Sequence, residues 1–369
     1  MSARKVKTRK RVIFAMLIFL LVVIGLAGIK TWKYLSIGIQ LIANNKIELK
    51  QSEQKRINLL LLGIGGGTHE GPDLTDTIIY ANIDPNTKKV VLVSIPRDIW
   101  IPELEAKINS AYTYGEEKQK GKGLLLTSAA VEKVLGQQVD YILKIDFDGF
   151  VKAVDMVGSL DIDVDNAFDD FAYPLTGREN DLCGHEDTKI ATFSAQIATG
   201  SASILDLFPC RFEHLHFDAG LTQMDGITAL KYVRSRHAIG EEGSDFARSK
   251  RQEKVIAAFK DKIFSLDALL NPVKALNLID VVNDSIETNI KEDEYDDFIR
   301  LARKFKSAAI TSVVLDTGDS QTGRPGLLMN PQIGPEYLNQ WVLVPTAGNG
   351  NYTEIRKYIE CEIKGNCGS

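Results

Sequence analysis

Short apolar runs and longer amphipathic segments alternate along the chain from residue 56 onward. Residues 57–63 are a continuous apolar run that ends at a glycine, which is typical of a buried strand. Residues 77–83 and 89–95 resemble it, and the turn sequence Asp84-Pro-Asn-Thr between them predicts a hairpin. In residues 160–164 apolar side chains alternate with aspartates, which predicts a half-exposed edge strand. Further strands are expected at 139–147, 310–316 and 341–344.

Helical spacing of apolar side chains marks several longer segments. It is clearest in residues 124–135 and 245–264, and a glycine ends the similar segment 150–157. Other helices are expected at 224–233, 267–279, 292–306 and 352–361. Periodicity is lost over residues 167–217, which we interpret as an insertion. Because strands and helices are mixed throughout, the pattern predicts an α/β fold, with a three-layer α/β/α arrangement around a mixed central sheet.

The N-terminal region has a different pattern. Residues 12–29 contain no charged side chain, and residues 1–11 carry six Lys and Arg and no acid. This combination predicts a single transmembrane helix with the N-terminus in the cytoplasm and the rest of the chain outside it. A cleaved signal peptide is the alternative, but Lys30, Trp32, Lys33 and Tyr34 follow the run in place of an A-x-A cleavage site.

These boundaries divide the 369 residues into five parts. They are a basic cytoplasmic tail (1–11), the transmembrane helix (12–29), a juxtamembrane spacer (30–55), a main domain (56–345) and a C-terminal tail with a short helix (346–369). All 49 acidic residues follow residue 11, so the part outside the cytoplasm is net acidic. Nucleic acid is therefore not an expected partner, and a positive site must be built locally by folding.

Four cysteines suit an oxidising compartment. Cys183 and Cys210 bracket much of the insertion, and Cys361 and Cys367 lie six residues apart. We expect these two pairs to be disulfides. Four cysteines permit three pairings, however, and four free thiols remain the alternative.

The charged positions with the clearest chemistry are arginines. Arg234 and Arg236 end one predicted helix, and Arg248 and Gln252 lie one turn apart on the next. Arg97 follows a predicted strand far upstream. Guanidinium groups match phosphate oxygens two at a time, so we expect these side chains to converge on a polyphosphate. The glycines at 65–67 lack the Gly-Lys-Ser/Thr ending of a nucleotide loop, and neither a zinc pattern nor a Gly-x-Ser-x-Gly elbow is present.

Eight short motifs occur in a fixed order between residues 57 and 258. They are Asn58-Leu-Leu-Leu-Leu-Gly63, Asp76-Thr77, Ser94-Ile-Pro-Arg97-Asp98, Lys107-Ile-Asn109-x-Ala-Tyr112, Asp146-Phe-Asp-Gly-Phe150, Gly226-x-x-Ala-Leu230, Arg234-x-Arg236-His237 and Asp245-x-x-Arg248-x-x-x-Gln252. In this order and spacing, behind a predicted membrane anchor, the chain resembles the LytR-CpsA-Psr family.

The resemblance implies a function and a location. Members of that family are transferases anchored on the outer face of the cytoplasmic membrane. They move glycopolymers from a polyprenyl-pyrophosphate carrier onto peptidoglycan, usually with magnesium. The expected protein is therefore a single-pass phosphotransferase whose catalytic domain, 56–345, is extracytoplasmic. Its partners would be the membrane, the lipid-linked glycan and peptidoglycan, and its cofactor would be Mg²⁺ or Mn²⁺.

Residue roles follow from the matched motifs. The expected pyrophosphate-binding residues are Arg97, Lys107, Asn109, Arg234, Arg236, Arg248 and Gln252. Asp98 and Asp245 complete the expected catalytic set, either as a general base or as carboxylates that orient an arginine. Arginine stays protonated, so it cannot accept the proton of an acceptor hydroxyl.

The metal site departs from the family pattern. Asp76 matches a magnesium-binding aspartate of the family, and a hard cation prefers such oxygen ligands. The family's other aspartate, two residues after the Leu-Gly pair, is Gly65 in this chain. Asp73 is the expected replacement, and His69 and Glu70 are weaker candidates.

Two other functions use the same residues. With water as the acceptor, the site would be a polyprenyl-pyrophosphate phosphohydrolase. Without turnover, the protein would bind lipid-linked glycan intermediates. All three functions need an apolar groove for the lipid, and the helices predicted at 124–135, 150–157 and 245–264 are candidates to form it with the sheet.

Overall fold

A six-stranded mixed sheet forms the centre of the computed structural model, which describes residues 47–52, 55–67, 71–265, 283–305, 308–319 and 324–367. The strand order is β11-β6-β1-β2-β3-β12. β1 is antiparallel to β2 and parallel to β6, and β3 is parallel to β12. The strands are β1 (Ile57–Ile64), β2 (Thr75–Asp84), β3 (Lys89–Ser94), β6 (Tyr141–Asp146), β11 (Ile286–Thr288) and β12 (Ala309–Val314). The predicted hairpin of β2 and β3 is confirmed.

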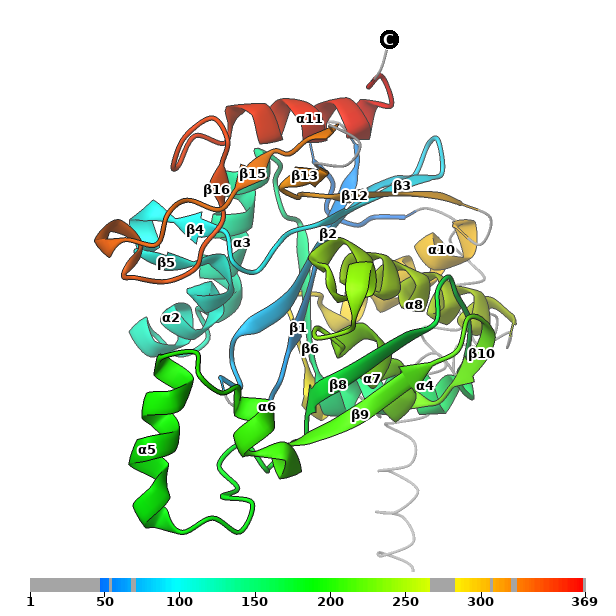
Figure 1. Ribbon diagram of the computed structural model, residues 1–369. Coiled ribbons are helices and arrows are strands. Elements are labelled where there is room, and N and C mark those ends of the chain that lie inside the picture. The colour runs from blue at the N-terminus through cyan, green and yellow to red at the C-terminus, as the bar shows by residue number, and fades with distance from the viewer. Residues whose placement is uncertain are drawn as a thin grey trace, which may run out of the picture.

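Helices cover both faces of this sheet (Figure 1). Successive side chains of a strand point to opposite faces. Leu60 and Leu62 of β1 therefore belong to one core, which includes residues of α3 (Gly123–Leu135) and α11 (Thr353–Lys364). Leu61 belongs to the other face, where Ile256 of α8 packs. The α/β fold with a mixed central sheet is as the sequence pattern predicted.

Three more helices lie on the α8 side. They are α4 (Phe147–Val157), α7 (Gly226–Arg234) and α10 (Tyr295–Lys304), beside α8 (Asp245–Ser265). Asp146 caps α4 by accepting a hydrogen bond from Gly149 N at 2.8 Å. A Cβ on Gly226 would lie 2.4 Å from Val151 O, so only glycine allows α7 to pack this closely on α4. This contact fixes the first turn of α7 against α4, and Arg234 lies at the other end of the same helix.

Residues 167–217, where the sequence shows no clear periodicity, contain regular elements in the structure. β8 (Phe168–Pro174) pairs with β9 (Phe212–Phe217), and the hairpin carries α5 (Asp187–Ala198) and α6 (Ile204–Leu207) away from the body (Figure 1). β8 has a break in register after Asp170, which hides the strand period from a sequence reading. The predicted disulfide Cys183–Cys210 is confirmed, as is Cys361–Cys367.

Several other expectations are corrected or lie outside the described residues. β7 (Leu160–Val164) alternates between buried and exposed side chains and is an edge strand, as predicted; it pairs with β10 (Gly220–Met224) in a separate two-stranded sheet. The strand predicted at 341–344 is reduced to β16 (Val344–Pro345). The expected helices at 12–29 and 267–279 fall outside the described residues. Among the residues described, no helix is long and apolar enough to cross a membrane.

The remaining elements are short. They are α2 (Ala111–Lys118), β4 (Trp100–Ile101), β5 (Ala106–Lys107), β13 (Gly318–Asp319), β14 (Arg324–Pro325), β15 (Leu328–Met329) and the 3₁₀ turns η1 (Pro102–Leu104), η2 (Ile108–Ser110), η3 (Pro209–Arg211), η4 (Gly240–Gly243), η5 (Asn283–Ser285), η6 (Glu292–Glu294) and η7 (Pro335–Tyr337).

Candidate functional site

An apolar cavity of about 350 Å³ lies between the central sheet and helices α4, α7 and α8. Its walls are mainly aliphatic and aromatic, and include Leu61, Ile79, Leu143, Ile145, Phe147, Phe150, Leu230, Val233, Val255 and Ile256. Polar side chains of five expected site residues line the same cavity: Asp76, Arg234, Arg236, Arg248 and Gln252. The expectation that α3 helps to form the apolar groove was wrong, because α3 packs on the opposite face of the sheet.

Arg234 is held against aromatic rings. Its guanidinium carbon lies 4.1 Å from the centre of the Phe147 ring, and its Nη1 donates to the Tyr173 hydroxyl at 3.2 Å. Stacking of this kind fixes the plane of a guanidinium without consuming all of its donors. Burial raises the pKa of Tyr173, and the charge of Arg234 acts in the opposite direction. The tyrosine is therefore a neutral support for the arginine at ordinary pH.

Arg236 lies in a loop whose backbone is anchored by a buried carboxylate. Asp170 is fully buried and accepts from Ser235 Oγ at 2.7 Å, from Arg236 N at 3.1 Å and from His237 N at 3.2 Å. Arg251 holds the other side of the loop, donating to Ser235 O at 2.7 Å. Neither anchor was found from the sequence. Asp170 lies two residues after Phe168, so in a strand both side chains would point to the same, buried side. This spacing was the signal in the sequence that could have identified Asp170 as a buried carboxylate.

Arg97 is positioned from the opposite side of the site. Its Nη1 donates to Asp76 Oδ1, and its Nε lies 3.4 Å from Asp98 Oδ2. Asp98 is buried and also accepts from Lys107 Nζ at 2.7 Å. Asn109 N donates to Arg97 O at 3.2 Å. Arg97, Asp98, Lys107 and Asn109 are all absent from the described residues that line the cavity, so Arg97 is linked to it through Asp76, which does line it.

α8 brings its polar residues to the sheet through side-chain hydrogen bonds. Gln252 Nε2 donates to Thr77 Oγ1 at 3.2 Å, and the hydroxyls of Ser249 and Ser94 lie 3.1 Å apart. Arg248, one turn before Gln252, lines the same cavity. Asp245 opens α8, but its side chain is outside those described.

The expected metal ligands are only partly brought together. Asp76 lines the cavity, whereas Asp73 is exposed, does not line it, and accepts at its backbone carbonyl from Thr113. Asp146 lines the cavity with Asp76 and was not among the metal ligands expected from the sequence. A Cβ on Gly66 would lie 2.8 Å from Asp146 Cβ, so the glycine loop after β1 rests against this carboxylate. Two carboxylates in a cavity that arginines also line could hold a hard divalent cation whose other ligands are water or phosphate oxygens.

No third carboxylate or histidine joins these two in the part of the chain that the structure describes. The one cluster of three possible ligands found there is Asp181 with Cys183 and Cys210, whose sulfurs are joined in the disulfide. That cluster is therefore not a thiolate metal site.

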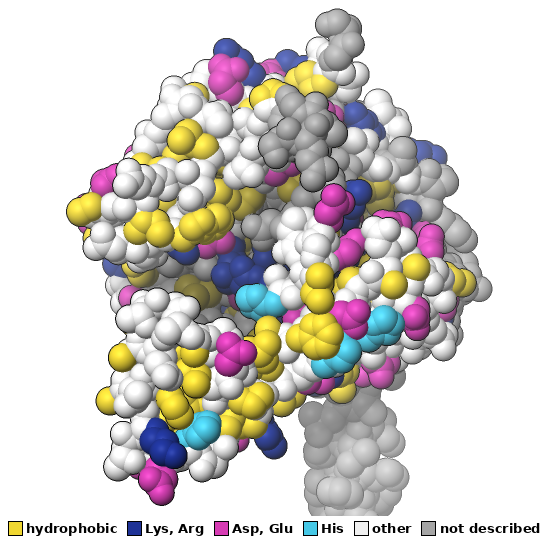
Figure 2. Space-filling view, in the orientation of Figure 1, with side chains coloured by type: hydrophobic (Ala, Val, Ile, Leu, Met, Phe, Trp, Pro, Cys, Tyr) yellow, Lys and Arg dark blue, Asp and Glu magenta, His cyan; other side chains and the backbone are white. Residues whose placement is uncertain are grey.

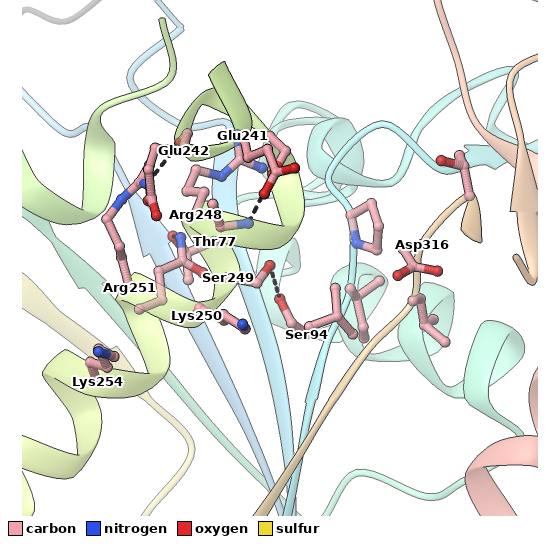
Figure 3. A pocket seen from close by; sticks show the side chains of 18 of the residues that line it. Thr77, Ser94, Glu241, Glu242, Arg248, Ser249, Lys250, Arg251, Lys254 and Asp316 are labelled. Atoms are coloured by element: carbon pink, nitrogen blue, oxygen red, sulfur yellow. Dashed lines mark hydrogen bonds and ion pairs between the residues drawn. The ribbon is translucent and has the colours of Figure 1, made fainter. Parts of the chain in front are cut away.

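A second cavity of about 600 Å³ adjoins the first (Figure 3). Asp76, Thr77, Arg248 and Gln252 line both cavities. The second has many more polar side chains, contributed by α8, η4, the end of β3 and residues 314–318. In Figure 2, Lys and Arg side chains gather at a hollow near the middle of the visible face. The site thus consists of an apolar cavity and a polar cleft that meet at Asp76, Thr77, Arg248 and Gln252.

Comparison with known proteins supports a family assignment. The family model described as the LytR_cpsA_psr family matches residues 35–324. The chain is 25% identical over 332 residues to the polyisoprenyl-teichoic acid–peptidoglycan teichoic acid transferase TagV of Bacillus subtilis (strain 168), covering 86% of this chain and 73% of that protein. It is 26% identical to the similarly named TagU of Oceanobacillus iheyensis, of which it covers 61%. It is 27% identical to biofilm regulatory protein A of Streptococcus mutans, of which it covers 51%.

Solved structures share the fold. The crystal structure of B. subtilis TagV superposes with a TM-score of 0.54 at 23% identity, covering 85% of this chain and 99% of that one. The structure titled TagT bound to LI-WTA gives a TM-score of 0.52 at 20% identity, covering 88% and 96%.

Proposed function

Because this chain belongs to the LytR-CpsA-Psr family, as its motifs predicted, we propose that it transfers a polyprenyl-pyrophosphate-linked glycopolymer onto peptidoglycan. The names of its relatives point to a polymer of the teichoic acid class. The observation that carries the proposal is the apolar cavity with three arginines among its lining residues. A long isoprenoid chain with a pyrophosphate at its end matches that combination of surfaces.

The proposed reaction is a phosphoryl transfer. A hydroxyl oxygen of the acceptor attacks the sugar-side phosphorus of the pyrophosphate. The bond from that phosphorus to the bridging oxygen breaks, and polyprenyl phosphate leaves with the electron pair. The hydroxyl proton passes to solvent. Negative charge grows on the leaving phosphate, so cations fixed beside it lower the barrier.

Roles for the residues follow from their positions. Arg234, Arg236 and Arg248 bind the phosphates directly, and Gln252 donates a hydrogen bond to them. Arg97 acts through Asp76, to which it is ion-paired. Asp98 has one basic partner on each side, Arg97 and Lys107, which favours orientation over general-base catalysis.

Asp76 and Asp146 are the proposed ligands of Mg²⁺ or Mn²⁺. When bound, the ion would neutralise charge on the phosphates. Asp146 takes the place of the carboxylate that the family has where this chain has Gly65. Mn²⁺ binding measured by electron paramagnetic resonance tests this assignment without turnover. Asp146→Asn should weaken binding, and Asp73→Asn should leave it unchanged; the opposite result would return the second ligand to Asp73.

The location is proposed to be the cytoplasmic membrane. Residues 12–29 would cross it once with the N-terminus inside, and the catalytic domain of residues 56–345 would lie outside. The disulfides Cys183–Cys210 and Cys361–Cys367 support an extracytoplasmic domain, because such bonds persist in oxidising compartments.

The decisive experiment follows a labelled glycan from a polyprenyl-pyrophosphate donor to a peptidoglycan fragment, using the purified full-length protein with magnesium. Transfer that depends on the acceptor supports the proposal. Equal release of polyprenyl phosphate without the acceptor would identify a phosphohydrolase. Donor binding without release would identify a protein that only holds lipid-linked intermediates.

A further inference from the structure

The polar cleft beside the arginines is larger than the apolar cavity and has no role in the reaction described so far. It extends from Arg248 and Gln252 past Ser94 and Ser249 to Asp316 on the opposite wall (Figure 3). The hydroxyl, amide, carboxylate and ammonium groups along it can each make hydrogen bonds with a ligand. A cleft of this kind suits a molecule that is polar along its whole length.

The charges in this cleft nearly balance. Five carboxylates and four cationic side chains line it: Asp76, Asp165, Glu241, Glu242 and Asp316, with Arg248, Lys250, Arg251 and Lys254. Arg251 Nη1 lies 2.9 Å from Glu242 and Lys254 Nζ lies 2.5 Å from Asp165, so cations of the cleft are paired with its own carboxylates. A phosphate-rich polymer would meet as many negative groups as positive ones here. A neutral, hydroxyl-rich chain would not be repelled.

An exposed indole lines the same cleft. Trp341 is 44% exposed, whereas Trp100 is buried with 3% exposed. Large aromatic side chains are normally covered, and one left open beside hydrogen-bonding groups commonly marks a binding surface. The flat apolar face of an indole fits the C–H face of a sugar ring, while the polar groups nearby fit its hydroxyls.

We propose that this cleft binds the acceptor, as a neutral strand of N-acetylated amino sugars, with Trp341 as its stacking platform and Asp316 as a hydrogen-bond acceptor. The inference rests on the proposed function and adds that the acceptor enters through the polar cleft while the lipid-linked donor occupies the apolar cavity. The two cavities meet only at Asp76, Thr77, Arg248 and Gln252 among the residues that line them. An acceptor hydroxyl in the cleft would therefore approach the phosphorus from the side opposite the lipid, as an in-line displacement requires.

The first test is kinetic and separates the two substrates. In the full-length protein, Trp341→Ala should raise the KM for a peptidoglycan fragment by roughly tenfold, the size of one lost aromatic contact, and leave the donor KM unchanged. Asp316→Asn should raise the acceptor KM less. Tyr358→Ala removes an aromatic side chain of similar exposure from α11, outside the cleft, and should change neither constant. A rise confined to the donor KM would assign the cleft to the donor's glycan and overturn the proposal.

The second test needs no turnover, so it stays informative if the proposed transfer fails. Glycan fragments released from peptidoglycan by a muramidase are titrated into the protein while intrinsic tryptophan fluorescence is measured. Saturable quenching that disappears in Trp341→Ala, with an unchanged melting temperature, supports the cleft. Absence of quenching in the unmodified protein, or quenching that survives the substitution, would overturn it.

Discussion

The two cavities that meet at Arg248 and Gln252 differ in chemistry although one helix lines both. Val255 and Ile256 of α8 face the apolar cavity, whereas Lys250 and neighbouring residues of the same helix face the polar cleft. The boundary between the two surfaces passes through the residues proposed to bind phosphate. In the proposed function, this boundary would keep lipid and sugar on separate surfaces, and the pyrophosphate between them would reach the arginines. Four predictions break or sharpen this comparison.

Removing two of the arginines that line the apolar cavity should have the largest effect. Arg234→Ala combined with Arg236→Ala should lower kcat by about two to three orders of magnitude, because cations beside the leaving phosphate are lost. Both cavities would remain, so donor and acceptor fragments should still bind. Arg178→Ala, at an exposed arginine of the insertion, is the control. Undiminished transfer in the double variant would remove the arginines from the mechanism.

Removing the buried carboxylate that anchors the Arg236 loop should have the next largest effect. Asp170→Ala leaves the amides of Arg236 and His237 without their shared acceptor. The expected loss is about 2–4 kcal/mol in the free energy of unfolding, measured with urea, together with reduced kcat. Asp169→Ala, at the half-buried neighbouring position, should have a much smaller effect on both. Full activity in the destabilised Asp170 variant would show that the loop does not need this anchor.

Filling one cavity at a time should separate the substrates. Val233→Trp places a large side chain in the apolar cavity and should raise the donor KM by roughly tenfold. Thr317→Trp does the same in the polar cleft and should raise the acceptor KM. The two variants are matched controls for each other. If both changed the same constant, the cavities would not hold different substrates.

The smallest effect concerns pH and lies on the outer face of the β8–β9 hairpin. Hydrogen bonds that the His216 ring makes to the carboxylates of Asp169 and Asp218 raise the pKa of His216, and hydrogen bonds from His216 and His214 lower the pKa of Asp169. Because the pKa of His216 is higher in the folded state than in the unfolded state, protonated His216 stabilises the fold. This contribution to the free energy of unfolding is complete below the unfolded-state pKa of about 6.5 and is lost as pH rises through the folded-state pKa. The melting temperature should therefore fall slightly across that range. His216→Asn should remove the dependence, and an unchanged slope would assign it to other groups.

The apolar runs of β1, β2 and β3 and the helical spacing of α3 and α8 could be read from the sequence. Local periodicity in these elements agrees with their burial. The arginine motifs could also be read, because residues close in sequence stay close on one helix or loop. Both disulfides join cysteines that are neighbours in chain order.

Only the tertiary structure decided which distant residues support the site. Asp170 reaches the Arg236 loop across 66 positions, and Asp146 comes beside the Asp76 cavity because β6 pairs with β1. Neither contact can be predicted from the pattern of apolar and polar residues along the sequence. Each depends on which strands pair, and that is not encoded in the order of side chains within a single strand. The separation of an apolar cavity from a polar cleft arose in the same way, from the placement of α8 on one face of the sheet.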